Sequence, residues 1–176
     1  MMFTVTRDTG GPTFEEYAGV IWPSLYRSAY LLAGNHPDAE DVAQQTLVKV
    51  YRSWSQVMRS DSPEAYVRRM LTNTFLSARR AKKWRLELLT EPPPEYDSAA
   101  TPHAPEDRMV IWPHVKALPP RQRAVIVLRY YEDLNEQEIA DALGCSRGNV
   151  KSTAHRALKA LRAALGEERD GGMELR

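Results

Sequence analysis

The chain has 176 residues, 43% of them hydrophobic and 27% charged, which suits one or two small packed domains and excludes global disorder. Its 24 lysines and arginines nearly balance 23 acids, which excludes nucleic-acid binding through overall charge. The single cysteine, Cys145, excludes an internal disulfide and a multi-cysteine metal site. We expect no signal peptide, because the N-terminus lacks a basic start followed by an apolar run. No apolar run approaches ~18 residues, so we expect no membrane insertion and therefore a cytoplasmic protein.

Three helices are predicted in the first half of the chain. Apolar residues at helical spacing predict the first over residues 13–33, in which Pro23 should kink the helix or split it in two. A second is predicted over residues 38–54. The third is predicted over residues 63–84 with Ser62 as its cap, because proline is favoured at the first helical position.

Charge and proline content mark a boundary in the middle of the chain. Residues 65–86 contain seven lysines and arginines and no acid, whereas residues 91–107 contain five acids and neither lysine nor arginine. Five of the twelve prolines fall within residues 91–105, and such a run does not continue a helix. We therefore predict a flexible N-terminus at 1–13, a domain at 14–86, an acidic linker at 87–106, a domain at 107–166 and a tail at 167–176.

Four further helices are predicted after the linker. Residues 107–118 form the first of these, and Pro120 opens the second. Asn135 and Glu138 are spaced as a capping box, which predicts a short third helix that stops at Gly144. Ser146 caps the fourth, a long amphipathic helix whose apolar stripe consists of Val150, Ala154, Leu158, Leu161 and Leu165.

The last two predicted helices have the lengths of a helix-turn-helix, in which the second helix enters the major groove of DNA. Arginine and lysine match the acceptors of guanine, and asparagine matches adenine. A basic amphipathic helix by itself is more often a solvated face, but the preceding short helix and turn favour DNA contact. The predicted contact residues are Arg147, Asn149, Lys151, Ser152, Thr153, His155, Arg156 and Lys159.

Three segments carry a family resemblance: DAEDVAQQTLVKVYRSW, AYVRRMLTNTFLSARRAKKW and LPPRQRAVIVLRYYEDLNEQEIADALGCSRGNVKSTAHRALKALR. In this order they resemble the sigma-70 family of transcription initiation factors over roughly residues 14–165. The match is to the short extracytoplasmic-function (ECF) group, and the opening FEEYAGVIWPSLYRSAYLLAGNHPDAED resembles an actinobacterial subgroup. The resemblance implies an all-α fold of two small helical domains joined by the acidic, proline-rich linker, the second domain being the helix-turn-helix.

The resemblance also implies a function. The chain would be an alternative sigma factor that binds core RNA polymerase, recognises the −35 and −10 promoter elements and aids promoter opening. Its implied partners are core polymerase, promoter DNA and an anti-sigma factor, and it implies no cofactor. The predicted helix-turn-helix would read the −35 element. The segment at residues 38–54 would dock on the polymerase through Asp41, Gln44, Gln45 and Leu47, although many family members have an acid where Gln45 stands.

The basic helix matches the reader of the −10 element. Reading an opened strand requires cations for the phosphates and aromatic or amide groups for the unstacked bases. Asn73 matches a family asparagine in the pocket for a flipped base, while Tyr66 could equally be a core residue. The implied −10 residues are Arg59, Asp61, Tyr66, Arg69, Asn73, Arg79, Arg80, Lys82 and Lys83.

An enzyme is excluded, because the sequence has neither a phosphate-cradling glycine loop nor a local Ser/His/Asp arrangement. Two other classes of function remain as alternatives: a stand-alone regulator and a protein that only sequesters polymerase. Acids such as Asp38 at a helix start are expected from the helix dipole and do not indicate a metal site. A stand-alone regulator would bind duplex DNA tightly without polymerase. A protein that only sequesters polymerase would leave both DNA-reading faces idle.

Overall fold

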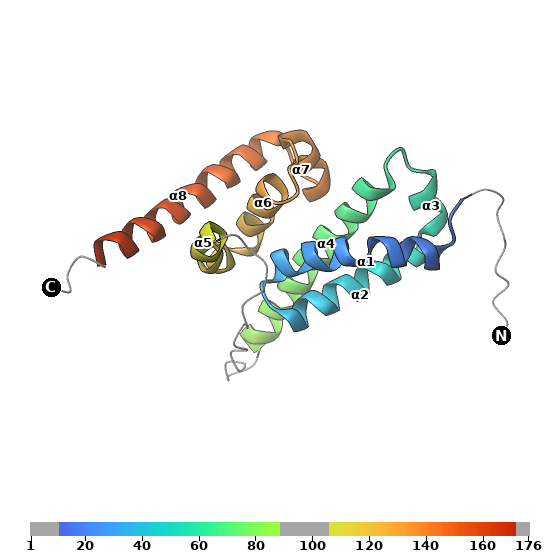
Figure 1. Ribbon diagram of the computed structural model, residues 1–176, viewed down its shortest axis with the longest axis horizontal. Helices are drawn as coiled ribbons and strands as arrows, with labels where there is room; N and C mark the ends of the chain where they lie inside the picture. The colour runs from blue at the N-terminus through green and yellow to red at the C-terminus, as the bar shows by residue number, and fades with distance from the viewer. Residues whose placement is uncertain (1–10, 89–105, 172–176) are drawn as a thin grey trace.

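The computed structural model describes residues 11–88 and 106–171, and side chains within 11–82 and 111–166. These parts of the chain form eight α-helices and no strand (Figure 1). The prediction of an all-α fold is therefore confirmed. Most of the linker predicted at 87–106 lies outside the described residues. The helices are α1 (Phe14–Ala33), α2 (His36–Arg52), α3 (Trp54–Arg59), α4 (Pro63–Leu88), α5 (Glu106–Ala117), α6 (Pro120–Tyr130), α7 (Glu136–Leu143) and α8 (Arg147–Gly171).

The first helix is continuous, so of the two outcomes expected at Pro23, a kink or a split, the split is excluded. Thr13 and Glu16 form a capping box at its start, and Gly34 ends it in the left-handed conformation with φ of 83°. Pro23 is exposed, as is Gly19 one turn earlier, so the carbonyl that proline leaves without a donor can be hydrated. Exposure of that turn is why the helix continues through the proline.

The caps predicted for the later helices are present. Ser62 Oγ accepts a hydrogen bond from the N–H of Ala65 at the start of α4, and Ser146 Oγ accepts one from Asn149 at the start of α8. The predicted second helix ends two residues early, at Arg52, and the short helix α3 follows it. Sequence reasoning missed α3 because its N-cap, Ser53, makes no side-chain capping bond.

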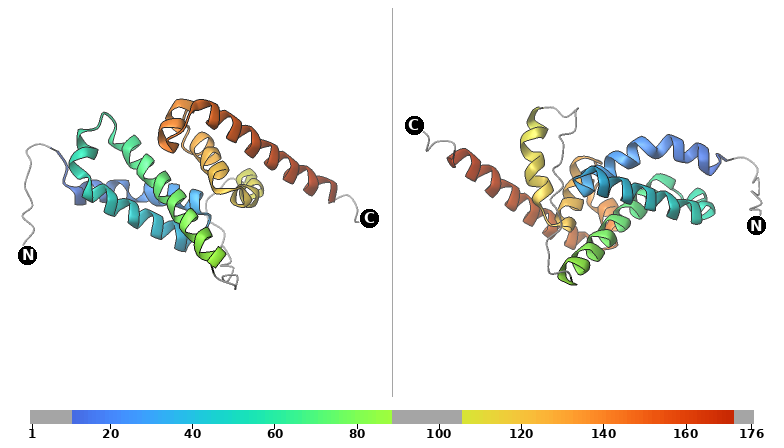
Figure 2. Two further views of the ribbon diagram at one scale, coloured as in Figure 1. Left: turned by 180° about the vertical axis from the view of Figure 1, so that it is seen from behind. Right: turned by 90° about the horizontal axis from the view of Figure 1, so that it is seen from below.

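The two domains each have buried helix faces and also pack against each other. Helices α1–α4 enclose Leu32, Val50, Val57 and Phe75, all at most 2% exposed. In the second domain α6 is buried from Arg123 to Leu128, with the other three helices around it. Helix α7 packs on α4 and α6 packs on α1, so one core cluster continues across both domains. Figure 2 shows that α8 extends away from this junction.

The capping box of α7 gives the first testable prediction. Asn135 Oδ1 accepts hydrogen bonds from Gln137 and Glu138, and Glu138 accepts one from the N–H of Asn135. Asn135→Ala should lower the free energy of unfolding by about 1 kcal/mol, because the first-turn N–H groups lose their acceptor. Urea unfolding followed by circular dichroism measures this. The same substitution at the exposed, mid-helix Asn73 is the control, and an equal loss there would contradict the capping role.

Candidate nucleic-acid interface

The helix-turn-helix is built by α7 and α8. Gly144 takes φ of 59° at the end of α7, a conformation that a side chain would disfavour, and the N–H of Cys145 bonds to the carbonyl of Ala140. Ile139 and Val150 are fully buried and join the two helices to one core. This packing fixes the direction in which α8 presents its first turns, as major-groove readout requires.

Seven of the eight residues predicted to contact DNA on α8 are exposed, and one is not. Thr153 is 3% exposed, and its Oγ1 lies 3.3 Å from Asn149 Oδ1. It sits beside the buried positions Val150 and Ala154, at the edge of the apolar stripe. The exposed seven are Arg147, Asn149, Lys151, Ser152, His155, Arg156 and Lys159.

One carboxylate lies against the cations of this face. Glu136, in the first turn of α7, is 3.9 Å from Arg147 Nη2 and 3.6 Å from Lys151 Nζ, and it also pairs with Arg129 at 3.7 Å. Both recognition-helix cations are mostly exposed, so these pairs are weak. Arg156 instead lies along its own helix, with Nε bonding to the carbonyl of Ser152.

The basic helix α4 presents a second face. Arg69, Asn73 and Arg80 recur at helical spacing and are all exposed. Tyr66 is half-buried against the core, and its hydroxyl donates to Gln56 Oε1 at 3.3 Å. Of the other predicted −10 residues, Arg59 and Asp61 are exposed before the helix begins, and the side chain of Lys83 lies outside those described.

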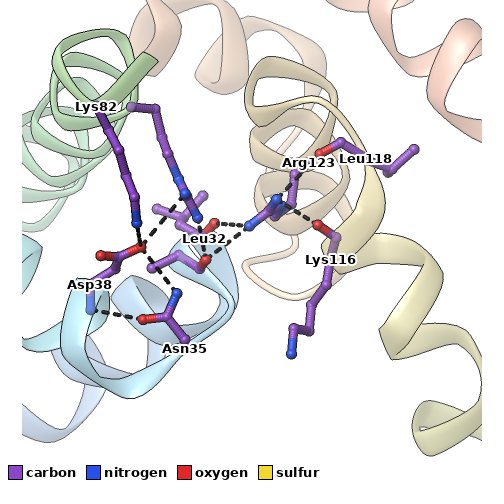
Figure 3. Close-up of polar contacts among 9 residues, drawn as sticks. Leu32, Asn35, Asp38, Lys82, Lys116, Leu118 and Arg123 are labelled. Carbon is purple, nitrogen blue, oxygen red and sulfur yellow. Dashed lines mark hydrogen bonds and ion pairs between the residues drawn. The ribbon is translucent and has the colours of Figure 1, made fainter. Parts of the chain in front are cut away.

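Two of the predicted −10 cations are bound to the protein itself. Arg79 Nη2 donates to the carbonyl of Ala33 at 2.7 Å, its Nη1 lies 3.6 Å from Asp38, and its guanidinium lies over the ring of Phe75. Lys82 Nζ is 3.3 Å from the same carboxylate of Asp38 (Figure 3). Burial opposes ionisation of Asp38, but the hydrogen bond from Asn35 and the two cations hold its pKa below the usual value.

Helix α2 carries the residues predicted to dock on the polymerase. Asp41, Gln44 and Gln45 are exposed, while Leu47 is half-buried against the core. The same exposed side also carries Val48 and Tyr51, which are 49% and 56% exposed. Sequence reasoning missed these two apolar residues, although positions 41, 44, 48 and 51 follow helical spacing and could have shown them.

A groove of about 590 Å³ runs between α2 and α4. Its lining joins Asp41 and Gln45 of the α2 face to Lys49, Arg79 and Lys82. The predicted polymerase-docking residues and two of the predicted −10 cations therefore border one depression. In the described parts of the chain, no helix could span a bilayer and no group of three His, Cys, Asp or Glu residues is placed to hold a metal ion.

Comparison with known proteins gives the family to which these two helical domains belong. Residues 22–85 match sigma-70 region 2 and residues 115–161 match sigma-70, region 4. The RNA polymerase sigma-E factor of Streptomyces avermitilis is 40% identical over 163 residues, which cover 89% of this chain and 87% of the relative. The chain belongs to the sigma-70 family. The ECF RNA polymerase sigma factor SigL of Mycobacterium tuberculosis is 31% identical, with 88% and 87% covered, which agrees with the ECF type.

Solved structures agree with the fold of this sigma factor. The sigma factor RpoE of Bartonella quintana, in complex with the anti-sigma factor NepR, superposes with a TM-score of 0.73 at 23% identity, covering 87% of this chain and 96% of that one. CnrH, in complex with the cytosolic domain of CnrY, gives a TM-score of 0.56 at 22% identity, with 88% of each chain covered. The protein is thus an alternative ECF sigma factor, which directs promoter-specific transcription.

Proposed function

We propose that the two domains divide promoter recognition between them. Residues 14–86 form the region 2 domain, which binds core RNA polymerase and reads the −10 element, and residues 107–166 form the region 4 domain, which reads the −35 element. Residues 87–106 link them. The observation that carries this proposal is the helix-turn-helix, whose second helix turns seven polar or basic residues to solvent.

Readout of the −35 element rests on the first turns of α8. Arg156 and Lys151 have the donors that guanine O6 and N7 accept, and Asn149 can pair with adenine. Arg147 and Lys151 form only weak, exposed pairs with Glu136, so we propose that DNA displaces this carboxylate readily when α8 binds. The buried Thr153 would then support the helix from within rather than contact a base.

Readout of the −10 element rests on Arg69, Asn73 and Arg80. Two cations for phosphates flank one amide for an unstacked base, which is the combination that single-strand binding needs. We propose that Arg79 mainly fastens α4 to the end of α1, since its guanidinium is already bonded there. Lys82 is more exposed and can exchange Asp38 for a phosphate.

We propose that this protein assists promoter opening but does not open the promoter by itself. Base-pair stacking is worth about 1.4 kcal/mol per step, so opening a dozen pairs costs far more than one basic helix recovers. The isolated protein should therefore bind promoter DNA weakly and should not hold an open bubble. A specificity subunit that acts on the polymerase surface fits this requirement, whereas a stand-alone regulator does not.

Docking on the polymerase gives the second testable prediction. Asp41→Ala should weaken binding to core polymerase by about 1–2 kcal/mol and leave the fold intact, because the side chain is exposed on α2. Fluorescence anisotropy of labelled protein titrated with core polymerase measures the affinity. Asp141→Ala, an exposed acid on α7, is the matched control. Unchanged affinity of Asp41→Ala would contradict the assignment.

We further propose the cellular setting. The chain has no catalytic activity of its own and acts in the cytoplasm, where it meets the polymerase. An anti-sigma factor binds it, by analogy with the NepR complex of the Bartonella sigma factor, which supports this point through the shared fold.

The experiment that tests the proposed function is run-off transcription with purified core polymerase on fragmented genomic DNA, with and without this protein. New transcripts with defined starts, preceded by two shared sequence elements, are the expected result. Tight duplex binding without new transcripts would instead favour a stand-alone regulator.

A further inference from the structure

Three cations of the second domain converge on one carboxylate beside the recognition helix. Glu136 Oε1 lies 3.7 Å from Arg129 Nη1. Its Oε2 lies 3.9 Å from Arg147 Nη2 and 3.6 Å from Lys151 Nζ. We call Arg129, Arg147 and Lys151 the three-cation cluster. Its members come from α6 and α8, and Glu136 comes from α7, so the contact lies where these three helices pack together (Figure 1).

Helix formation alone does not explain the acid at position 136. The capping box at the start of α7 uses Asn135 and Glu138, each of which accepts a hydrogen bond from the backbone N–H of the other. Glu136 gains from the dipole of α7, as any acid in the first turn does. Its carboxylate lies against the cations of α6 and α8, and its side chain is only 23% exposed. The contact with the cluster is therefore a specific feature of this acid.

The cations are more accessible than the carboxylate that they surround. The side chains of Arg129, Arg147 and Lys151 are 38%, 59% and 63% exposed. Water screens each of these ion pairs, so none of them is strong. The Arg129 guanidinium also lies over the exposed ring of Tyr130, with its central carbon 5.8 Å from the ring centroid. An outside anion can therefore reach the cluster and compete with Glu136 for it.

A DNA phosphate is the anion that this place favours. When the second helix of a helix-turn-helix enters the major groove, the first helix crosses the phosphate backbone. The cluster lies between the first turn of α7 and the first two turns of α8, where these two parts of the motif meet. A phosphodiester carries one negative charge on two oxygens, as a carboxylate does, and arginine binds both groups through paired hydrogen bonds. Glu136 thus occupies the cluster as a backbone phosphate would.

We infer that the three-cation cluster binds one backbone phosphate beside the −35 element, and that Glu136 competes with this phosphate from inside the protein. The inference rests on the proposed function, because α8 must meet DNA for the two anions to compete. It adds Arg129, which lies outside the helix-turn-helix, to the residues that contact DNA. Lys151 is the most exposed of the three cations, so it can leave the phosphate for a guanine while the two arginines stay.

The competition lowers the affinity for DNA without changing which sequence is preferred. DNA displaces the weakly paired carboxylate readily, but the ion pairs that are lost still reduce the net gain from the phosphate contact. The same loss applies to promoter and non-promoter DNA, because phosphates carry no sequence information. Glu136 therefore weakens the sequence-independent hold of the region 4 domain on any duplex.

Glu136→Gln tests the competition, because the amide keeps the shape of the side chain and removes its charge. The free variant, and the holoenzyme that contains it, should bind duplex DNA roughly threefold to tenfold more tightly. The factor should be the same on promoters with an intact and with a scrambled −35 element. Anisotropy titrations at one fixed salt concentration measure both affinities. Asp141→Asn removes the same charge from an exposed position on α7 and is the matched control, with an expected change below about twofold because salt screens distant charges.

A neutral phosphate analogue locates the site. Methylphosphonate can replace one phosphate at a time along the backbone that borders the −35 element. At one position this replacement should abolish the gain of Glu136→Gln. Arg129→Gln, combined with Glu136→Gln, should also reduce the gain on unmodified DNA, since both changes act on the same contact and their effects should not add.

Three results would overturn the inference: an unchanged affinity of Glu136→Gln, an equal gain for Asp141→Asn, or a gain confined to the intact −35 element. The last would mark a base contact instead of a phosphate contact. Run-off transcription separates these results from failure of the proposed function. A wild-type holoenzyme that starts no new transcripts would count against the proposed function, while the affinities of the free chain would still decide whether Glu136 competes with DNA.

Discussion

Arg123→Met should lower the free energy of unfolding by about 3 kcal/mol and loosen the packing between the domains. The substitution removes four hydrogen bonds that the charged guanidinium donates. The carbonyls that lose this donor are those of Leu32, Ala33, Lys116 and Leu118. Hydrogen bonds to charged groups are worth about 1.5–3 kcal/mol each. The net loss is smaller than their sum, because methionine fills most of the space and the desolvation cost of the buried cation disappears.

Urea unfolding followed by circular dichroism measures the loss, and small-angle X-ray scattering measures the loosened packing as a larger radius of gyration. Arg80→Met is the matched control, because Arg80 is exposed on α4 and bonds only to Ser77 at 3.4 Å among the described contacts. If Arg123→Met changed the free energy of unfolding by no more than the ~0.5 kcal/mol expected of surface substitutions, the stabilising role of this buried guanidinium would be contradicted.

Arg156→Ala should weaken binding of the holoenzyme to promoters with an intact −35 element by about 1–3 kcal/mol, roughly tenfold to a hundredfold. The exposed side chain can be removed without unpairing a buried group, so protein stability should stay the same. A base contact is lost only where the matching base pair is present, and the effect should therefore vanish on a promoter with a scrambled −35 element.

Anisotropy titrations of the holoenzyme on the two promoters give this comparison. Arg162→Ala, also exposed but nearly two turns further along α8, is the control and should cost little on either promoter. An equal loss for Arg156→Ala on both promoters would mark a phosphate contact and would remove Arg156 from the base-reading set.

Local rules were sufficient for most of the secondary structure. Ser62, Asn135 and Ser146 cap helices because each places an acceptor before a run with helical spacing, and such signals need only neighbouring residues. The sequence left both a kink and a split open at Pro23, because the outcome depended on which side of α1 faces solvent. Periodicity alone does not settle that question.

For the candidate site, local patterns predicted which helix faces are exposed but not the long-range contacts of individual side chains. The exposed face of α8 followed from its apolar stripe, and only Thr153, at the edge of that stripe, is buried. Arg79 was predicted as a DNA contact from charge density, yet its guanidinium bonds to the end of α1. Arg123 and Glu132 carried no local signal, because their partners on α1 lie 90 or more residues away in the chain.

We propose that the exposed face of α4 reads the −10 element and that the exposed face of α8 reads the −35 element. Site-specific photo-cross-linking in the open promoter complex tests it most directly, with a photoreactive residue at Ser77 or at His155, both of which are exposed. Position 77 should cross-link within the −10 element and position 155 within the −35 element. Cross-links exchanged between the elements, or none to promoter DNA from either position, would contradict it.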